Sequence, residues 1–478
     1  MNQPETASVI SSSAEVSSAE YFAQRQLKQG TVGWLLLIGL GVAYVISGDF
    51  AGWNFGIAQG GWGGMFIATA LAALMYLCLC LSMSEMSTMM PTAGGGYSFA
   101  RAAFGPFGGY LTGTAILIEY TIAPAAIAVF IGGYCESLFG INGWMIYLAC
   151  YAIFMGIHLK GAGEALKIMF AITLVAAVAL VVFIGAMIPH FNAQNLFHIP
   201  VSTGVGASLF LPHGYLGIWA AVPFAIWFFL AVEGVPLAAE EAKDPAKSLP
   251  RGLIGAMLIL TAFAMLILFL GAGAAGASTL QNSGAPLVDA LVKVYGTNTW
   301  LATFVNFVGL AGLIASFFSI IYAYSRQIFA LSRAGYLPTS LSLTNKNKAP
   351  YLAIIIPGII GFLLSLTKEG DSLILIAVFG ATISYVLILL SHIKLRLSKP
   401  DMPRPYKTPG GIITSSIALV LAVAAVVAGF VVNPKVWFIA AGIYVAFIAY
   451  FLFYSRYHLV KGTPEEEFAN IKAAEQEL

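Results

Sequence analysis

Long apolar runs alternate with short polar segments along most of the chain. Runs of roughly 20 apolar residues recur, which is the length that an α-helix needs to cross a hydrocarbon layer of about 30 Å. Membrane β-strands would instead alternate apolar and polar positions over about ten residues. The pattern predicts an all-α integral membrane protein with twelve transmembrane helices, in windows at 33–58, 62–84, 108–135, 143–157, 165–187, 216–238, 252–275, 300–327, 351–366, 373–393, 412–432 and 436–455.

Two of these windows contain residues that weaken a continuous helix. The first contains ISGDFAGWN at 46–54, with several glycines and short polar side chains, and the sixth contains FLAVEGVPLAAEE at 229–241, with Glu233, Gly234 and Pro236. Glycine and short polar residues lower helix stability, and proline removes a backbone hydrogen bond. The sequence therefore predicts that helices 1 and 6 are discontinuous near the middle of the membrane.

Paired breaks in two halves of a membrane protein are typical of secondary transporters with inverted repeats and a binding site at the midplane. We expect a 5+5 core of the LeuT-like kind, with a first repeat at 31–187 and a second at 216–396. Two additional helices would follow at 411–456. The segments 1–30 and 457–478 are predicted to be tails.

The composition is typical of a membrane protein, and the positions of the basic residues predict its orientation. Hydrophobic residues make up 59% and charged residues 9% of the chain, whereas soluble proteins carry about 25% charged residues. Lysine and arginine stay on the cytoplasmic side of short loops. With cytoplasmic termini, all of the 23 lysines and arginines except Lys293, Lys368 and Lys435 lie inside. The net charge of +2 predicts no nucleic-acid partner.

Three carboxylates fall deep inside the predicted spans, namely Asp49, Glu119 and Glu233, and no lysine or arginine accompanies them. Each charge costs about 2.5–3.5 kcal/mol at mid-membrane, and such residues usually mark a path for ions or substrate. Protonation, polar neighbours or an incoming cation could satisfy them. The last option indicates a cation-handling protein, although a structural role stays open for each residue.

The sequence predicts no enzyme, metal site or cofactor. The cysteines Cys78, Cys80, Cys135 and Cys150 lack metal-ligand spacing. An intramembrane aspartyl protease would need a second deep aspartate beside Asp49, and no His-Glu-x-x-His motif is present. A cation channel usually has a symmetric ring of filter residues, which two dissimilar breaks in one chain do not supply.

Two long motifs resemble the amino acid-polyamine-organocation superfamily of permeases. SEMSTMMPTAGGGYSFARAAFGPFGGYLTG (84–113) is similar to the signature after its second helix, and FAIWFFLAVEGVPLAAEEAKDPAKSLPRG (224–252) is similar to its sixth-helix pattern. The resemblance covers about residues 30–457. It implies an outer aromatic gate at Trp227 and an inner gate at Glu233.

The first helix differs from that of the amino-acid members. Their Gly-Ser-Gly stretch, which binds the substrate carboxylate, is replaced here by Gly52, Trp53 and Asn54, with Asp49 one turn earlier. A substrate carboxylate would meet like charge there, whereas an amine would gain an ion pair. With the sixth-helix motif, this stretch resembles the ethanolamine permeases of the superfamily.

The resemblance implies import of a small protonated amine, with ethanolamine as the first candidate. Its ammonium would lie by Asp49 and under Trp227, where cation-π attraction contributes about 2 kcal/mol. Gly52, Trp53, Asn54, Glu119 and Glu233 complete the predicted binding residues. A cationic amino acid or polyamine permease or exchanger is the alternative, and a cation channel is a third.

The coupling ion stays open. Glu119 could carry a proton, Ser316 and Ser319 could line a sodium site, and uniport or exchange would need neither. The expected partners are the small cationic substrate and the lipid bilayer, and a homodimer is compatible with the sequence. The expected location is a bacterial inner membrane, with multiple passes and both termini cytoplasmic.

Overall fold

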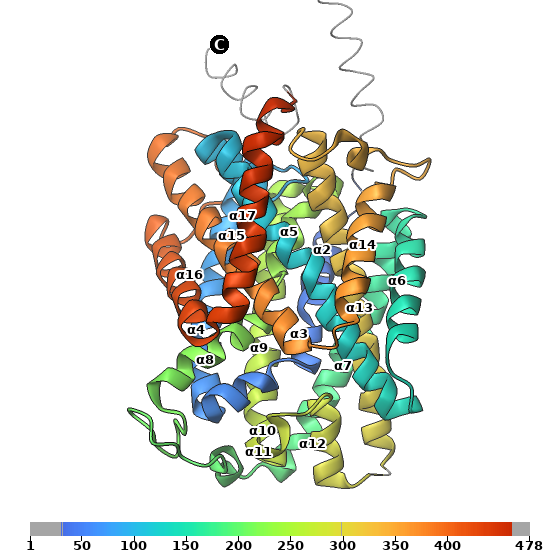
Figure 1. Cartoon of the computed structure of the whole chain (residues 1–478), viewed down its shortest axis with the longest axis vertical. Coiled ribbons are helices and arrows are strands. Elements are labelled where there is room, and N and C mark those ends of the chain that lie inside the picture. Colours follow the sequence, from blue (N-terminus) through green and yellow to red (C-terminus); the bar gives the residue numbers. More distant parts are fainter. Residues whose placement is uncertain (1–29, 31, 298, 461–478) are drawn as a thin grey trace, which may run out of the picture.

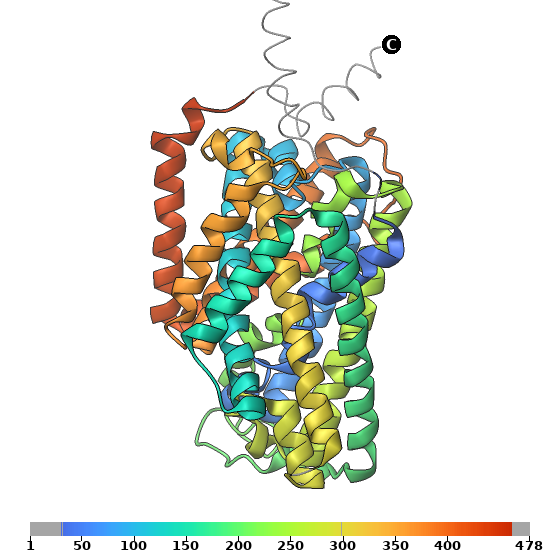
Figure 2. The same cartoon turned by 90° about the vertical axis from the view of Figure 1, so that its right-hand side faces the viewer.

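The computed structural model describes residues 30, 32–297 and 299–460. Its long helices run roughly parallel to one another along the length of the molecule (Figures 1 and 2). Each apolar window of the sequence falls on helical structure, and the described residues contain no β-strand, only two isolated bridges. The all-helical class is therefore confirmed. Most of both predicted tails, residues 1–29 and 461–478, lies outside the described residues.

The first half of the chain forms the elements α2 (Trp34–Val45), α3 (Ser47–Phe50), α4 (Asn54–Met89), α5 (Gly96–Phe139), α6 (Trp144–His158), α7 (Ala162–Met187), η1 (Ile188–His190), η2 (Ala193–Phe197), α8 (Gly214–Trp227) and η3 (Val232–Glu241). The second half forms α9 (Pro245–Leu266), η4 (Ile267–Gly271), α10 (Ala272–Ala275), α11 (Ala277–Leu280), α12 (Pro286–Tyr295), α13 (Trp300–Arg333), η5 (Thr339–Ser342), α14 (Tyr351–Ser365), α15 (Gly370–Ser398), α16 (Ile412–Val432), α17 (Pro434–Phe453) and η6 (Ser455–Tyr457).

Nine helical segments of the described chain are long and apolar enough to cross a membrane. Three shorter apolar helices, α2, α6 and α14, account for the other predicted windows. The protein is thus a multi-pass helical membrane protein. The number of twelve crossings and the inverted-repeat arrangement stay predictions.

The helices α4 and α5 both begin before the spans that the sequence predicts at 62–84 and 108–135. Each contains one glycine with a non-helical conformation just before the predicted span. Within α4, Gly61 has φ +69°, and a Cβ atom at this position would lie 2.2 Å from Pro212. Within α5, Gly105 has φ +75°. Only glycine adopts these conformations readily. The chain therefore changes direction at both glycines, and it is helical on either side of each of them.

The helices differ in how deeply they are buried. Of the apolar window of α5, 89% is buried inside the protein, whereas the value for α17 is 17%. Figure 1 shows α16 and α17 at the periphery, where α17 passes in front of the bundle. Thus α5 is in the packed centre of the molecule, whereas α17 lies on its outside.

An ion-pair cluster fixes the segment that joins α15 to α16. Glu85, near the end of α4, accepts hydrogen bonds from Arg396 Nη2 at 2.5 Å and Arg404 Nε at 2.9 Å. The backbone N–H of Thr408 donates to the same carboxylate at 2.7 Å. A buried carboxylate is stable when charge-assisted hydrogen bonds satisfy it in this way. The acid of the first motif therefore attaches the peripheral helices to the body.

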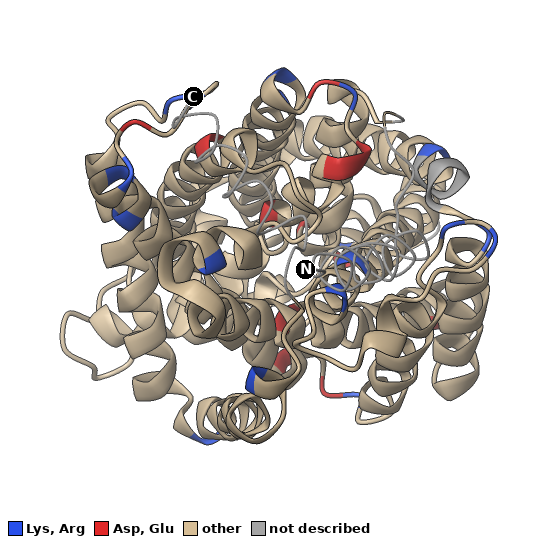
Figure 3. Ribbon diagram, turned by 90° about the horizontal axis from the view of Figure 1, so that it is seen from above, with Lys and Arg blue, Asp and Glu red and all other residues tan. Residues whose placement is uncertain are grey.

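The two ends of the described chain lie at the same end of the molecule, which is the upper end in Figure 1, and the 188–215 segment lies at the opposite end. Seen from above, lysines and arginines are distributed over this upper face (Figure 3). The predicted orientation, in which both termini and most basic residues lie on the cytoplasmic side, requires basic residues at this end. The identity of the upper side as cytoplasmic stays a prediction.

Candidate functional site

The two discontinuous helices cross each other in the middle of the molecule. The first is interrupted after Val45 and again at Ala51 and Gly52, where φ of Gly52 is +98°. The sixth is interrupted between α8 and η3, and Ala231 there has φ +78°. A Cβ atom on Gly48 would lie 2.6 Å from the carbonyl oxygen of Trp227. Glycine therefore permits the contact between the two breaks.

A serine from a distant helix holds the first interruption open. In a continuous helix the N–H of Ser47 would donate to the carbonyl of Ala43. Here the Ser47 N–H donates to Ser316 Oγ at 2.9 Å, and Ser316 Oγ donates to the Ala43 carbonyl at 2.7 Å. The hydroxyl is inserted into the hydrogen-bond ladder, which is a recognised cause of helix bending. The Ser319 hydroxyl, by contrast, bonds within its own helix to Ser316 O.

A small cavity of about 10 Å³ lies beside these breaks. This volume holds about one water molecule. The lining is mostly apolar and comes from four spans: Tyr44, Val45, Ser47, Ala123, Ile127, Trp227, Leu230 and Ile320. Of the binding residues predicted from the sequence, Trp227 lines this cavity, whereas the others do not: Asp49, Gly52, Trp53, Asn54, Glu119 and Glu233.

Two hydrogen bonds from neighbouring helices fix the carbonyls of the first break. Trp227 Nε1 donates to the carbonyl of Ala51 at 3.0 Å, and the Tyr134 hydroxyl donates to the carbonyl of Phe50 at 2.9 Å. These bonds satisfy carbonyls that the broken helix leaves free. Trp227 therefore lines the cavity and also forms a hydrogen bond with the backbone of the first break.

The other predicted residues of the first break pack against neighbouring segments. The Trp53 ring stacks on Phe228 with centroids 5.7 Å apart. Asn54 donates its two amide hydrogens to the carbonyls of Leu280 and Ser283, at 2.9 and 2.8 Å. In this conformation the Asn54 side chain is therefore engaged in holding α11 and the loop that follows it.

Asp49 is fully buried on α3, and neither of its carboxyl oxygens has a hydrogen-bond partner among the described residues. A charged carboxylate without a partner in such a place is costly. The group is therefore either protonated or prepared for a cation.

Glu119 and Glu233 form a second acidic site, separate from Asp49. The two carboxyl groups are close enough to interact electrostatically. The Tyr120 hydroxyl donates to Glu233 Oε1 at 3.4 Å, and both carboxyl oxygens of Glu119 lack a hydrogen-bond partner among the described residues. Two neighbouring carboxylates repel each other when both are ionised. The pair can hold a proton, or it can meet a cation.

Hydroxyl groups surround this acidic pair. Tyr76 and Tyr385, from α4 and α15, share a hydrogen bond of 2.7 Å and interact electrostatically with both glutamates. A Cβ atom on Gly234 would lie 3.0 Å from the Tyr120 hydroxyl. The acidic pair is thus enclosed by phenols that can donate to it.

Two ion pairs link the end of η3 to α13, and we call their four residues the inner ion-pair cluster: Glu240, Glu241, Arg326 and Arg333. Arg326 Nη2 lies 2.8 Å from Glu241 Oε1, with the two side chains 3% and 1% exposed. Arg333 Nη2 lies 2.7 Å from Glu240 Oε1. The contacts join the end of the sixth span to α13, so they close the molecule at its upper end.

Sequence reasoning identified part of this site only. The acidic pair at 240–241 was visible in the second motif, but it had no predicted partner, because Arg326 and Arg333 lie far away in sequence. The apolar cavity residues carried no signal, since an apolar side chain that faces a cavity resembles one that faces lipid. Ser316 was visible only as a small polar residue in a membrane helix.

No group of three histidine, cysteine, aspartate or glutamate side chains in the described part of the chain could hold a metal ion. The cysteines Cys78, Cys80, Cys135 and Cys150 are buried and free.

Comparison with known proteins gives a consistent result. The family model described as amino acid permease matches residues 3–453. The branched-chain amino acid permease BcaP of Bacillus subtilis is 27% identical over 89% of this chain and 92% of its own length. An uncharacterized transporter of Rhizobium meliloti is 28% identical over 80% of this chain and 83% of its own. The aromatic amino acid transport protein AroP of Escherichia coli is 25% identical over 79% and 84%.

Proposed function

Because this chain belongs to the amino acid permease family, a family of membrane transporters and not of enzymes, we propose that it carries a small solute with a protonated amine, and that ethanolamine is its substrate. Transport would proceed by alternating access, in which the cavity between the broken helices opens to one side and then to the other.

One observation carries the proposal: the carboxyl groups of Asp49, Glu119 and Glu233 are buried beside the breaks and have unpartnered oxygens. An ammonium group supplies both the positive charge and the hydrogen-bond donors that these oxygens need. In the proposed pose the ammonium approaches Asp49 under Trp227, while Glu119 and Glu233 retain a proton or accept the cation in passage.

Two further features support a small substrate without a carboxylate. The cavity of about 10 Å³ is far below the volume of a long polyamine, so a small solute needs less expansion of the site. A substrate carboxylate would need free backbone amides at the first break, but the N–H of Gly52 already donates to Asn54 Oδ1 at 3.2 Å. An amine without a carboxylate therefore requires less expansion of the site than the same amine with one.

A second candidate is a small apolar amino acid. The cavity lining is largely apolar, with Val45, Ile127, Leu230 and Ile320. Two relatives are described as branched-chain and aromatic amino acid transport proteins. Such a substrate would present its side chain to this lining and its ammonium to the carboxyl groups. A cationic amino acid remains a weaker candidate, because its longer chain needs a larger cavity.

Uptake into liposomes tests both candidates. Purified protein is reconstituted and given labelled ethanolamine, with excess unlabelled ethanolamine, serine, valine or arginine as competitors. Serine is the matched control, since it is ethanolamine with a carboxylate added. We expect ethanolamine to compete and serine not to compete. Equal competition by both would overturn the carboxylate argument, and competition by valine alone would establish the second candidate.

The same assay across pH, with and without sodium, identifies the driving ion. A proton-coupled carrier would accumulate substrate under an inward proton gradient in sodium-free buffer. A requirement for sodium would instead favour an ion site near Ser316 and Ser319. Facilitated equilibration without accumulation would indicate uniport.

A further inference from the structure

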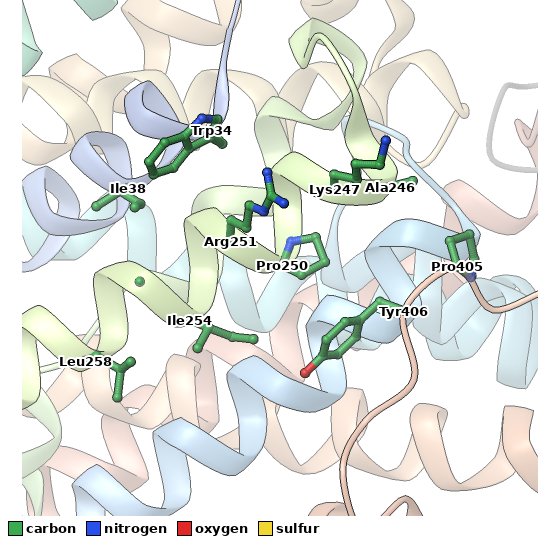
Figure 4. Close-up of a pocket in the computed structure, with 11 residues that line it drawn as sticks. Trp34, Ile38, Ala246, Lys247, Pro250, Arg251, Ile254, Leu258, Pro405 and Tyr406 are labelled. Atoms are coloured by element: carbon green, nitrogen blue, oxygen red, sulfur yellow. The ribbon is translucent and has the colours of Figure 1, made fainter.

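A groove of about 560 Å³ opens on the side of the molecule between α2, α9 and the segment that joins α15 to α16. Figure 4 shows Trp34 and Ile38 of α2 on one side of it, and Pro405 and Tyr406 of the joining segment on the other. Lys247, Arg251, Ile254 and Leu258 follow one face of α9 between them. The groove is separate from the cavity at the helix breaks, with which it shares no lining residue.

The chemistry of the groove changes along its length. Lys247 and Arg251 lie at one end and are exposed, whereas Leu258, which is 57% exposed, lies further along the same helix. With a rise of about 1.5 Å per residue, Leu258 is about 10 Å deeper in the apolar layer than Arg251. The groove is thus cationic at one end and apolar at the other.

The depth of these residues corresponds to the edge of a bilayer. Trp34, which is 47% exposed, begins α2, and tryptophan is enriched where headgroups meet hydrocarbon. Lys247 and Arg251 lie in the first turns of α9, next to the segment that carries Asp244. The cationic end therefore lies at the headgroup level, and the apolar end faces acyl chains.

The cations of the groove are available for an anion. Arg251 has no carboxylate partner among the residues that the structure describes. Lys247 lies 3.5 Å from Asp244, but both side chains are mostly exposed, at 72% and 51%, and such surface pairs are weak. A phosphate can accept two hydrogen bonds from the Arg251 guanidinium and one from Lys247.

We propose that this groove binds an anionic phospholipid from the adjacent leaflet, with its phosphate between Lys247 and Arg251 and one acyl chain along Ile38, Ile254 and Leu258. Clusters of basic residues at a membrane surface attract anionic headgroups, and the apolar remainder of the groove has the length and exposure to cover part of an acyl chain. The bound lipid would bridge α2 and α9.

Quenching of Trp34 fluorescence tests the proposal. The full-length protein is reconstituted in phosphatidylcholine vesicles that contain a small fraction of brominated phosphatidylglycerol, or the same fraction of brominated phosphatidylcholine. Trp34→Phe isolates the contribution of Trp34. From the attraction of two basic residues, we expect about tenfold enrichment of the anionic lipid at Trp34.

Variants of the charged end identify the binding residues. The double variant Lys247→Gln and Arg251→Gln should lose the enrichment. The matched control Lys160→Gln and Lys346→Gln, which removes two exposed cations from loops on the same face, should retain it. Both variants alter exposed side chains, and their thermal unfolding verifies that they fold.

Three results would overturn the proposal. Equal quenching by both brominated lipids would mean that something other than an anionic lipid covers the groove. Loss of enrichment in the control variant would mean a general surface attraction. Displacement of the lipid signal by millimolar inorganic phosphate would mean that the site takes the free anion, since a lipid held by its acyl chain as well would resist it.

Discussion

At the level of single residues, the buried carboxyl group of Asp49 lowers the stability of the fold. This carboxyl group is fully buried without a hydrogen-bond partner, and a charge at such a position costs several kcal/mol. A neutral amide of the same shape would avoid most of that cost. The carboxyl group therefore weakens the fold in this conformation, and its proposed benefit lies in meeting a cation during transport.

Replacement of Asp49 by asparagine separates the two effects. We expect Asp49→Asn to lose most uptake, about tenfold or more, because an ammonium loses its ion pair. The melting temperature should not fall, since no contact within the protein is lost. Asp371→Asn, which neutralises an exposed acid at the start of α15, is the matched control and should transport normally. Normal transport by Asp49→Asn would assign that residue a structural role.

At the level of elements, the first break depends on a residue in another helix. Ser316 occupies the position between the Ala43 carbonyl and the Ser47 N–H. Without that hydroxyl the two backbone groups can bond directly and continue α2 into α3. The break is therefore a property of the pair α2 and α13, and not of the first helix alone.

Ser316→Ala tests this interpretation. We expect uptake to fall about tenfold, while the free energy of unfolding changes by about 1 kcal/mol or less because the freed backbone groups pair with each other. Ser319→Ala is the matched control, because its hydroxyl bonds only within α13, and it should change stability by about 0.5 kcal/mol or less. Equal loss of uptake in both variants, restored by high sodium, would instead indicate an ion site.

The apolar windows predicted where the helices lie, but not how two of them break. Gly52 and Gly234 marked the correct segments, and the positive φ of Gly61 agrees with the boundary between the first two windows. The sixth helix nevertheless changes direction at Ala231, before Glu233, Gly234 and Pro236. Alanine gives no sequence signal for such a conformation, and the η3 segment that follows it packs against α2 and α9.

On the scale of the whole molecule, the inner ion-pair cluster closes one end. Arg326 and Glu241 are almost completely buried, and removal of one partner from a buried pair typically costs about 3–5 kcal/mol. The ion pair between Arg326 and Glu241 can form in this conformation and separate when the upper end of the molecule opens to solvent. It thus contributes to the balance between conformations of the transporter.

Glu241→Gln should lower the free energy of unfolding by about 3–5 kcal/mol, because Arg326 keeps a buried charge. Thermal unfolding in detergent measures this change. Asp244→Asn removes an exposed ion pair on the following segment and should cost about 1 kcal/mol or less. The double variant Glu241→Arg and Arg326→Glu should recover part of the stability. If Glu241→Gln and Asp244→Asn had equal effects, the pair would not hold this end closed.

The candidate site was partly predictable for a physical reason. Polar and aromatic residues such as Asp49, Glu233 and Trp227 are conspicuous in an apolar helix, so the sequence indicates them. Residues such as Val45 and Ile320 contribute to the cavity through their position alone. Their role depends on which way each helix faces, and that is decided by contacts between distant segments.

A short backbone contact near the inner ion-pair cluster has a mechanical consequence. Val32 N–H donates to the Glu241 carbonyl, and the N–H of Lys243 donates to the Val32 carbonyl, each at 2.9 Å. These bonds join the chain entering the first span to the chain leaving the sixth. As long as both bonds persist, the inner halves of the two broken helices can only travel together, as one moving part, and substrate release would need a single displacement in place of two.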